Sequence, residues 1–326
     1  MLSRTASHLY WMARYIERAE NTARMLDAAN QHALLPAARA DEARNWTGPL
    51  LITGREQIYL DSGRPVTAAD VTAYMALDAD NPCSIVACLA AARENARAVR
   101  STITSEMWEV VNTTWLGLRE FDAKVLRFRG TASFLDWVKE RSHLFRGVTF
   151  GTMLHDEAFR FNRLGTFIER ADNTSRILDI HYNSLVTQVG GRAADYYQWA
   201  ALLRSVSALE AYRKVFRHQV SASHVAQLLL LDPHLPRSLR YCVSEVLATL
   251  QVVLGQASSL SMRTAMGLYA ELDNATVEDL MASDDSLDVQ RLLGRILLLA
   301  EQIERELFAL RDAGTPSPVL PLRGVA

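Results

Sequence analysis

The apolar positions of this chain recur mainly at the spacing of an α-helix. Within residues 3–30, apolar side chains return every three or four positions, and polar side chains gather on the opposite face. The alternation expected of strands is scarce, and only 15 Gly and 9 Pro interrupt 326 residues. We therefore predict an all-α fold. The predicted helices span about residues 3–30, 42–57, 67–78, 84–103, 105–127, 132–147, 151–188, 194–217, 222–231, 236–256, 258–271 and 286–312.

Proline and serine mark several of the predicted helix starts. Pro82 and Pro236 each stand two residues before a serine, Ser84 and Ser238, whose hydroxyl can cap a helix. Ser3 is expected to cap the first helix in the same way. Loops are predicted near residues 37–41, 61–65, 190–191 and 232–236.

A stretch of thirteen residues occurs twice, 152 positions apart. Residues 15–27 read Tyr-Ile-Glu-Arg-Ala-Glu-Asn-Thr-Ala-Arg-Met-Leu-Asp, and residues 167–179 match them at nine positions. Such a long match indicates internal duplication. We predict a helical bundle built from two duplicated halves that pack together, residues 1–150 and 151–313, followed by an extended tail at 314–326. Weaker matches at offsets of 153 and 154 pair Trp46 with Trp199, Tyr59 with Tyr212, and Ser84 with Ser238.

The repeated segment places a ladder of charged and amide side chains on one face of its helix. In the first copy, Glu17 lies one helical turn from Asn21 and two from Arg24, with Arg18 at the edge of this face. Three interpretations are open: a solvated surface with salt bridges, a buried polar network between the halves, or a pocket for an anion or carboxylate. A solvated face would tolerate substitution, so retention in both copies favours a specific geometry. The ladder of the second copy comprises Glu169, Arg170, Asn173 and Arg176.

A second group of arginines follows the predicted helix start at Ser84. Arg93, Arg97 and Arg100 fall on one helical stripe, and three guanidinium groups so placed could bind a phosphate or a polycarboxylate. They could equally form ion pairs with nearby acidic residues. Those acidic residues are Glu94, Glu106 and Glu109.

Catalytic and metal-binding motifs are absent from the sequence. A di-iron helical bundle needs two Glu-x-x-His motifs, and Glu140 with His143 forms the only one. The trio His155-Asp156-Glu157 is more typical of a solvated helix start than of a catalytic site. We therefore expect neither a metal nor a cofactor. The six tryptophans are expected to be core residues.

Composition limits the class of partner. The net charge of −2 gives no overall positive field that would attract nucleic acid. No apolar run approaches the roughly 20 residues of a membrane span, and the N-terminus does not resemble a signal peptide. The three cysteines form no metal-binding spacing, and their odd number favours reduced thiols. We expect a cytoplasmic protein that binds neither nucleic acid nor membrane.

The repeated motif, together with its neighbours, resembles the bacterial alpha-E family of all-helical proteins with a Glu-Arg motif. The resemblance rests on the opening residues 1–27, the run 93–97, the second copy at 167–173, and the two Pro-x-Ser segments. Met12-Ala13 stands where Leu-Gly is common in the family, which should affect packing only. No catalytic residue is carried over, because the family has no established activity.

The resemblance implies a functional setting. Members of the family are commonly encoded beside a circularly permuted ATP-grasp protein and a transglutaminase-like cysteine peptidase. We therefore expect an accessory or binding protein of a system that forms or modifies a peptide or amide bond, partnering the ATP-grasp protein. The alternative is an enzyme acting on an amide or amino-acid substrate. Glu17 or Glu169 would then be the general base, and arginines would hold a carboxylate or phosphate.

Overall fold

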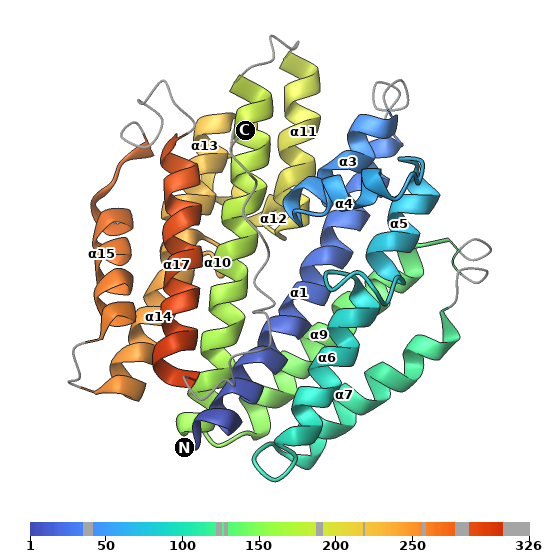
Figure 1. The fold of residues 1–326 in the computed structure, drawn as a ribbon. Coiled ribbons are helices and arrows are strands. Elements are labelled where there is room, and N and C mark those ends of the chain that lie inside the picture. The colour runs from blue at the N-terminus through green and yellow to red at the C-terminus, as the bar shows by residue number, and fades with distance from the viewer. Residues whose placement is uncertain are drawn as a thin grey trace.

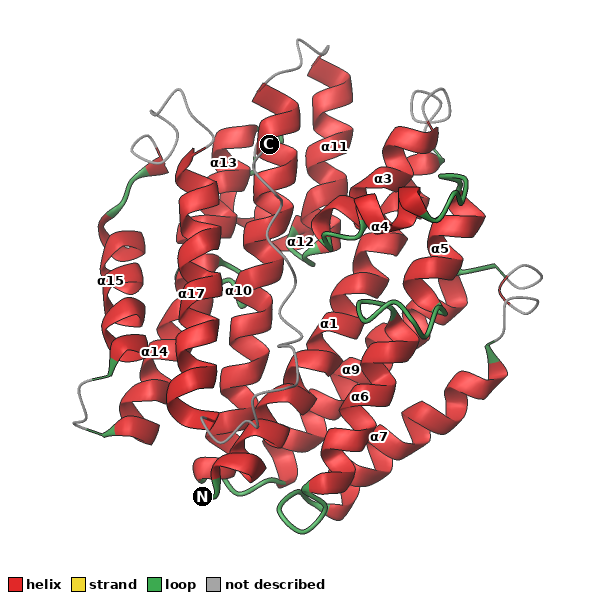
Figure 2. Cartoon of the chain, in the orientation of Figure 1, coloured by secondary structure: helices red, strands yellow, loops and turns green. Residues whose placement is uncertain are grey.

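Every regular element in the described part of the chain is helical, which confirms the predicted all-α class (Figure 2). The computed structural model describes residues 1–34, 42–121, 126, 130–186, 192–217, 219–255, 259–277 and 287–308, with the main chain only at 42, 182–186, 192–195 and 287–288. The predicted tail at 314–326 and the loops at 37–41 and 190–191 lie outside these ranges.

Two long helices, α1 (Ser3–Ala33) and α10 (Glu157–Val186), pack side by side at the centre of the molecule (Figure 1). No Gly or Pro interrupts α1, and Gly165 is the only such residue in α10. The absence of helix breakers lets each helix run for 30 residues or more. The repeated segment occupies the middle of both helices, so the fold brings its two copies together.

Each central helix is covered by helices from its own side of the chain (Figure 1). Around α1 pack α6 (Ile85–Ala98) and α9 (Ala132–Thr152), with α7 (Ser105–Gly117) against both. Around α10 pack α14 (Leu239–Leu254) and α17 (Leu287–Phe308), with α15 (Leu260–Asn274) against both.

Two further helices cross between these groups. Helix α11 (Arg192–Ser205) packs mainly on α1, and α3 (Glu42–Ile52) packs on both α1 and α10. The remaining elements are short. They are α4 (Glu56–Asp61), α5 (Ala68–Ala76), a 3₁₀ turn (Leu118–Glu120), α12 (Leu209–Phe216), α13 (Ala222–Ala226) and a π-helical turn (Gln227–Leu231).

Two helices predicted as continuous are each broken, so these boundaries were wrong. The predicted helix 42–57 stops before Gly54, whose φ of +65° is left-handed. The predicted helix 194–217 stops before Ser207, with φ of +54°. After each break a backbone N–H reaches back across the helix end: Arg55 to Leu50 O (2.8 Å) and Ala208 to Leu203 O (2.7 Å). Both are Schellman ends.

The serine caps were predicted correctly at two of three positions. Ser84 Oγ accepts a hydrogen bond from Ala87 N, and Ser238 Oγ accepts one from Tyr241 N, both at 3.1 Å. Ser3 is instead the first helical residue, and Leu2 occupies the cap position without a side-chain bond. In the helix predicted over 105–127, α7 ends at Gly117 and the 3₁₀ turn follows, while residues 122–125 and 127 lie outside the described ranges.

The amphipathic pattern of the sequence predicts that one face of each central helix is exposed, but the structure differs. Leu9, Met12 and Leu26 are buried as predicted, but so are the polar residues of the opposite face. The reason is that α1 has neighbours on all sides: α6, α9, α10 and α11. All six tryptophans are buried or pack partly buried against the core, as expected: Trp11, Trp46, Trp108, Trp115, Trp137 and Trp199.

Matching positions of the two copies make matching contacts. Thr22 Oγ1 donates to the carbonyl of Cys83 at 3.2 Å, and Thr174 Oγ1 donates to the carbonyl of Arg237 at 2.9 Å. Each carbonyl belongs to a Pro-x-Ser turn just before a helix. These contacts agree with the predicted duplication and its two halves, which stay a prediction.

The central helices approach each other closely at Gly165. A Cβ added there would meet the Tyr10 carbonyl oxygen at 2.2 Å and the Ala13 Cβ at 3.2 Å. We expect Gly165→Ala to lower the free energy of unfolding by about 1–3 kcal/mol, because the helices must separate. Urea denaturation measures this change.

The matched control is Gly147→Ala within α9, where an added Cβ meets nothing within 4 Å. Alanine is the better helix former, so this variant should gain up to about 1 kcal/mol. Equal stability of the two variants would show that the helices are not in close contact.

Candidate functional site

Two carboxylates and two arginines of the repeated motif form reciprocal pairs between α1 and α10. Glu17 accepts from Arg170, with Nε to Oε1 at 3.0 Å and Nη2 to Oε2 at 3.2 Å. Glu169 accepts from Arg18, with Nε to Oε1 at 2.5 Å and Nη2 to Oε2 at 2.9 Å. Glu17 and Glu169 are only 1% and 2% exposed, so the ladder is not a solvated surface. Each Glu-Arg dipeptide pairs with the other.

The Glu169 pair extends toward α17. Arg14 Nε donates to Glu169 Oε2 at 2.8 Å, and its Nη1 contacts Tyr10 Oη at 3.1 Å and Glu304 Oε1 at 3.2 Å. Arg14 is completely buried and lies over the ring of Trp11, at 4.7 Å from the centroid. This branch therefore joins α1, α10 and α17.

The Glu17 pair extends toward α14 through Arg237. This arginine sits in the turn before α14, and its Nη2 lies 2.8 Å from Glu17 Oε1 and 2.9 Å from Glu20 Oε1. Its Nη1 donates to Asn21 Oδ1 at 2.7 Å. Asn21 thus helps to hold a guanidinium that lies 216 positions later in the chain.

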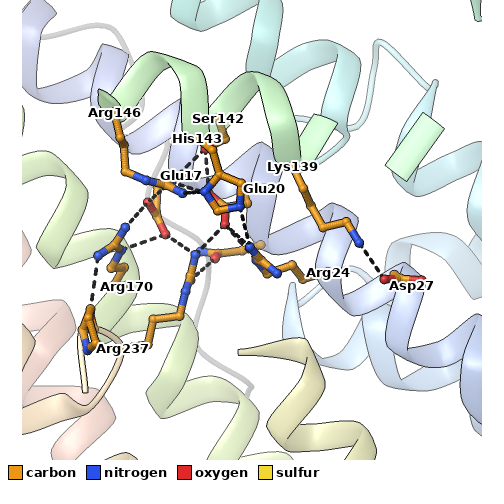
Figure 3. Close-up of polar contacts among 12 residues, drawn as sticks. Glu17, Glu20, Arg24, Asp27, Lys139, Ser142, His143, Arg146, Arg170 and Arg237 are labelled. Atoms are coloured by element: carbon orange, nitrogen blue, oxygen red, sulfur yellow. Dashed lines mark hydrogen bonds and ion pairs between the residues drawn. The ribbon is translucent and has the colours of Figure 1, made fainter. Parts of the chain in front are cut away.

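Glu20 connects the buried network to the molecular surface (Figure 3). Arg24 Nε and Ser142 Oγ donate to its two oxygens at 2.8 and 2.7 Å. Arg146, on α9, also pairs with Glu20 and lies 3.1 Å from Glu17 Oε2. His143 stands beside Arg24 and Arg146 at the exposed edge.

In the second copy, an arginine and an aspartate of the repeat pair with each other. Arg176 Nε donates to Asp172 Oδ1 at 2.7 Å, and both side chains are buried. Asp172 occupies the position of Glu20 in the repeat, and Arg176 that of Arg24. Asn173 is 7% exposed, and its Nδ2 has no hydrogen-bond partner among the described residues.

The arginine stripe of α6 lies apart from this network. Arg93 Nε donates to Asn112 Oδ1 at 2.9 Å, and both Arg93 and Arg97 pair with Glu94. Arg100 lies over the ring of Trp108, at 5.7 Å. The stripe is therefore an ion-paired surface, and no described contact joins it to the ladder.

This chain resembles known proteins over most of its length. A family model named Alpha-E, described as a predicted alpha-helical domain with a conserved ER motif, matches residues 1–308. The chain belongs to the Alpha-E family. An uncharacterised protein of Mycobacterium bovis and two of Mycobacterium tuberculosis are each 26% identical to this chain in an alignment of 277 residues that covers 78% of the chain. The chain spans about 30% of the length of these relatives. No solved structure matches it.

The pairing arrangement lowers the pKa of Glu17, Glu20 and Glu169 in this Alpha-E chain. Burial alone would raise the pKa of Glu169, but the charges of Arg18 and Arg14 outweigh it and hold the pKa at about 2. In the same way, Arg170 and Arg237 outweigh burial and lower the pKa of Glu17. The pKa of Glu20 lies well below its ordinary value.

These carboxylates are poorly suited to accept a proton. A general base works best when its pKa lies near the working pH, and it must reach the substrate. Glu17 and Glu169 are buried, and each is bound by several guanidinium groups. Neither lines the open pocket of about 480 Å³ that lies between the π-helical turn and residues 275–277. The geometry thus disfavours the general-base interpretation.

Other candidate chemistry of the sequence is also structural. Asp156 Oδ1 caps α10 by accepting from Ala158 N at 2.9 Å, and His155 stacks on Phe159. The three cysteines are free and buried, and burial raises the pKa of Cys242 to about 12. Within the described ranges, no three His, Cys, Asp or Glu side chains could jointly hold a metal ion, and no helix could cross a membrane.

Several network residues were not among the sequence candidates. Arg237 was visible only as part of a Pro-x-Ser segment, and His143 only as half of a Glu-x-x-His motif. The sequence gives only a weak signal for these residues, because each one contacts a network residue that is distant in the chain. The residues that the structure adds to the candidates are Tyr10, Arg14, Glu20, Ser142, His143, Arg146, Arg237 and Glu304.

Removing one member of a buried ion pair should lower the free energy of unfolding much more than removing a surface charge. We expect Glu169→Ala to lower the free energy of unfolding by about 3–5 kcal/mol, because Arg14 and Arg18 lose their shared counter-ion. Arg97→Ala is the control, since this side chain is 68% exposed, and it should change stability by less than about 0.5 kcal/mol. If urea denaturation shows that both variants lose the same unfolding free energy, the buried network is contradicted.

Acid should weaken the buried network over a defined range of pH. The folded pKa of Glu169 is about 2, below the roughly 4.3 of an unfolded glutamate. Its stabilisation is therefore complete above about pH 4.5 and is lost as the pH falls toward 2. We expect the unfolding free energy of Glu169→Gln to depend less steeply on pH in this range than that of the wild type. Parallel curves would show that the carboxylate does not titrate as described.

Proposed function

We propose that this chain is a helical accessory and binding protein of a system that forms or modifies a peptide or amide bond. Its partner would be a circularly permuted ATP-grasp protein, as the family resemblance implies. A transglutaminase-like cysteine peptidase is a second candidate partner. The buried, unpaired cysteines support a reducing, cytoplasmic location.

The observation that carries this proposal is the state of the repeated carboxylates. Glu17 and Glu169 are the residues that an enzyme of this design would use, and both are held by arginines inside the molecule. Their geometry stabilises the contact between α1 and α10. The motif is thus best explained as the element that keeps a binding scaffold rigid.

The length of the relatives supports an accessory role. Each mycobacterial relative matches this chain over about 30% of its own length, so most of that protein is other sequence. A unit that occurs within longer chains is typical of modules that work beside another domain.

The test is complex formation with the neighbouring ATP-grasp protein that the family resemblance implies. We expect the two purified proteins to co-migrate in size-exclusion chromatography at micromolar concentration. An ATP-grasp ligase from an unrelated system, of similar size, is the control and should elute separately. If the neighbouring protein also elutes separately, the proposed partnership is wrong.

The enzymatic alternative has a separate readout. The isolated chain would release product from amide or peptide substrates, and Glu17→Gln would abolish that release while leaving the chain folded. Loss of folding in Glu17→Gln, with no turnover by the wild type, would support the scaffold role.

A further inference from the structure

The polar network carries unequal charge in its two branches. On the Glu169 side, the described contacts join two arginines to two carboxylates, Glu169 and Glu304. On the Glu17 side, two carboxylates share four guanidinium groups, an excess of two positive charges. Those four groups belong to Arg24, Arg146, Arg170 and Arg237.

The excess positive charge reaches solvent between α1 and α9. Arg170 and Arg237 are buried, but the side chains of Arg24 and Arg146 are 13% and 24% exposed. His143 lies between these two arginines and is exposed (Figure 3). A small ligand could therefore reach this end of the network without any change in the fold.

The ring of His143 faces a hydrogen-bond donor at each nitrogen. Its Nδ1 lies 2.8 Å from Arg146 Nη2, and its Nε2 lies 3.2 Å from Arg24 Nη2. A neutral imidazole accepts at one nitrogen only, and guanidinium nitrogens never accept. In one of the two contacts, an imidazole N–H therefore faces a guanidinium N–H, and no hydrogen bond can form. An acceptor placed among the three side chains would satisfy all of them.

The protein acceptors nearby are already occupied. Glu20 Oε1 takes hydrogen bonds from Arg24 and Arg237, and its Oε2 takes them from Ser142 and Arg146. The Nδ2 of Asn21, in a side chain only 2% exposed, has no hydrogen-bond partner among the described residues. Donors exceed acceptors throughout this branch.

We propose that Arg24, His143 and Arg146 bind a small oxyanion, a carboxylate or a phosphate, at the surface between α1 and α9. Guanidinium groups bind both kinds of anion through charge-assisted hydrogen bonds. The assignment goes beyond the accessory role and does not depend on the ATP-grasp partner, because the site lies within this chain alone.

Proton uptake should accompany binding. Burial lowers the pKa of His143, Glu20 opposes this effect, and Arg146, Arg24 and Arg237 lower the pKa further. Lys139, one turn away on α9, is neutralised by Asp27 and Asp136. A bound anion offsets the surrounding positive charge and favours the imidazolium. The pKa of His143 should therefore rise when the anion binds, and binding should be tighter at pH 6 than at pH 8.

The test uses the full chain with two probes at constant ionic strength: sulfate for a tetrahedral anion and N-acetylglycine for a peptide-like carboxylate. Imidazole NMR, with His143 assigned from the His143→Gln spectrum, should show a rise of about one pH unit or more in the His143 pKa with the preferred probe. Calorimetry should show tighter binding at pH 6 than at pH 8, by at most about tenfold for each unit of that rise. The probe that binds more tightly identifies the chemistry of the ligand.

Two variants separate the site from general charge effects. His143→Gln removes an exposed side chain, so it should keep the wild-type melting temperature and lose the pH dependence of binding. Arg97→Gln removes a cation from the separate stripe on α6 and should bind as the wild type does. Either of two results would overturn the assignment: neither probe shifts the His143 pKa, or His143→Gln retains the pH dependence.

Discussion

The contact between α1 and α10 depends on neutralising charges that have been taken out of water. A buried carboxylate or guanidinium without a partner is far more costly than an exposed one. Here Glu17 meets Arg170 while Glu169 meets Arg18, so each central helix supplies the counter-ions of the other. Displacement of either helix would leave charges of both signs unpaired. The pairs therefore select one arrangement of the helices.

The same network positions the surrounding helices. Arg14 joins α17 through Glu304, Arg237 brings the start of α14 to Glu17 and Glu20, and Arg146 ties α9 to those same carboxylates. Gly165 allows the central backbones close enough for short side-chain contacts to form. Apolar packing supplies most of the burial, and the charges specify the register of that packing.

The paired network gives the Glu-Arg motif of this Alpha-E chain a structural role, because it joins the two central helices. The carboxylates are held ionised by neighbouring arginines, and the thiols are buried. The chemistry available to a ligand is instead at the edge of the network, where Arg24, His143 and Arg146 gather more donors than acceptors. The anion binding that we propose there would suit the proposed accessory role.

The sequence determined the helical class, the serine caps at Ser84 and Ser238, and the importance of the repeated Glu, Arg and Asn, because these follow from local spacing and from comparison of the two copies. The break at Ser207 lies among helix formers that conceal it, whereas Gly54 is a typical helix end that the predicted helix passed over. The sequence could not show that Arg146 and Arg237 form ion pairs with Glu20. These contacts exist only after α9 and the start of α14 have packed against α1. Only the tertiary structure decided that the polar face is buried, because burial depends on what surrounds a helix and not on its own periodicity.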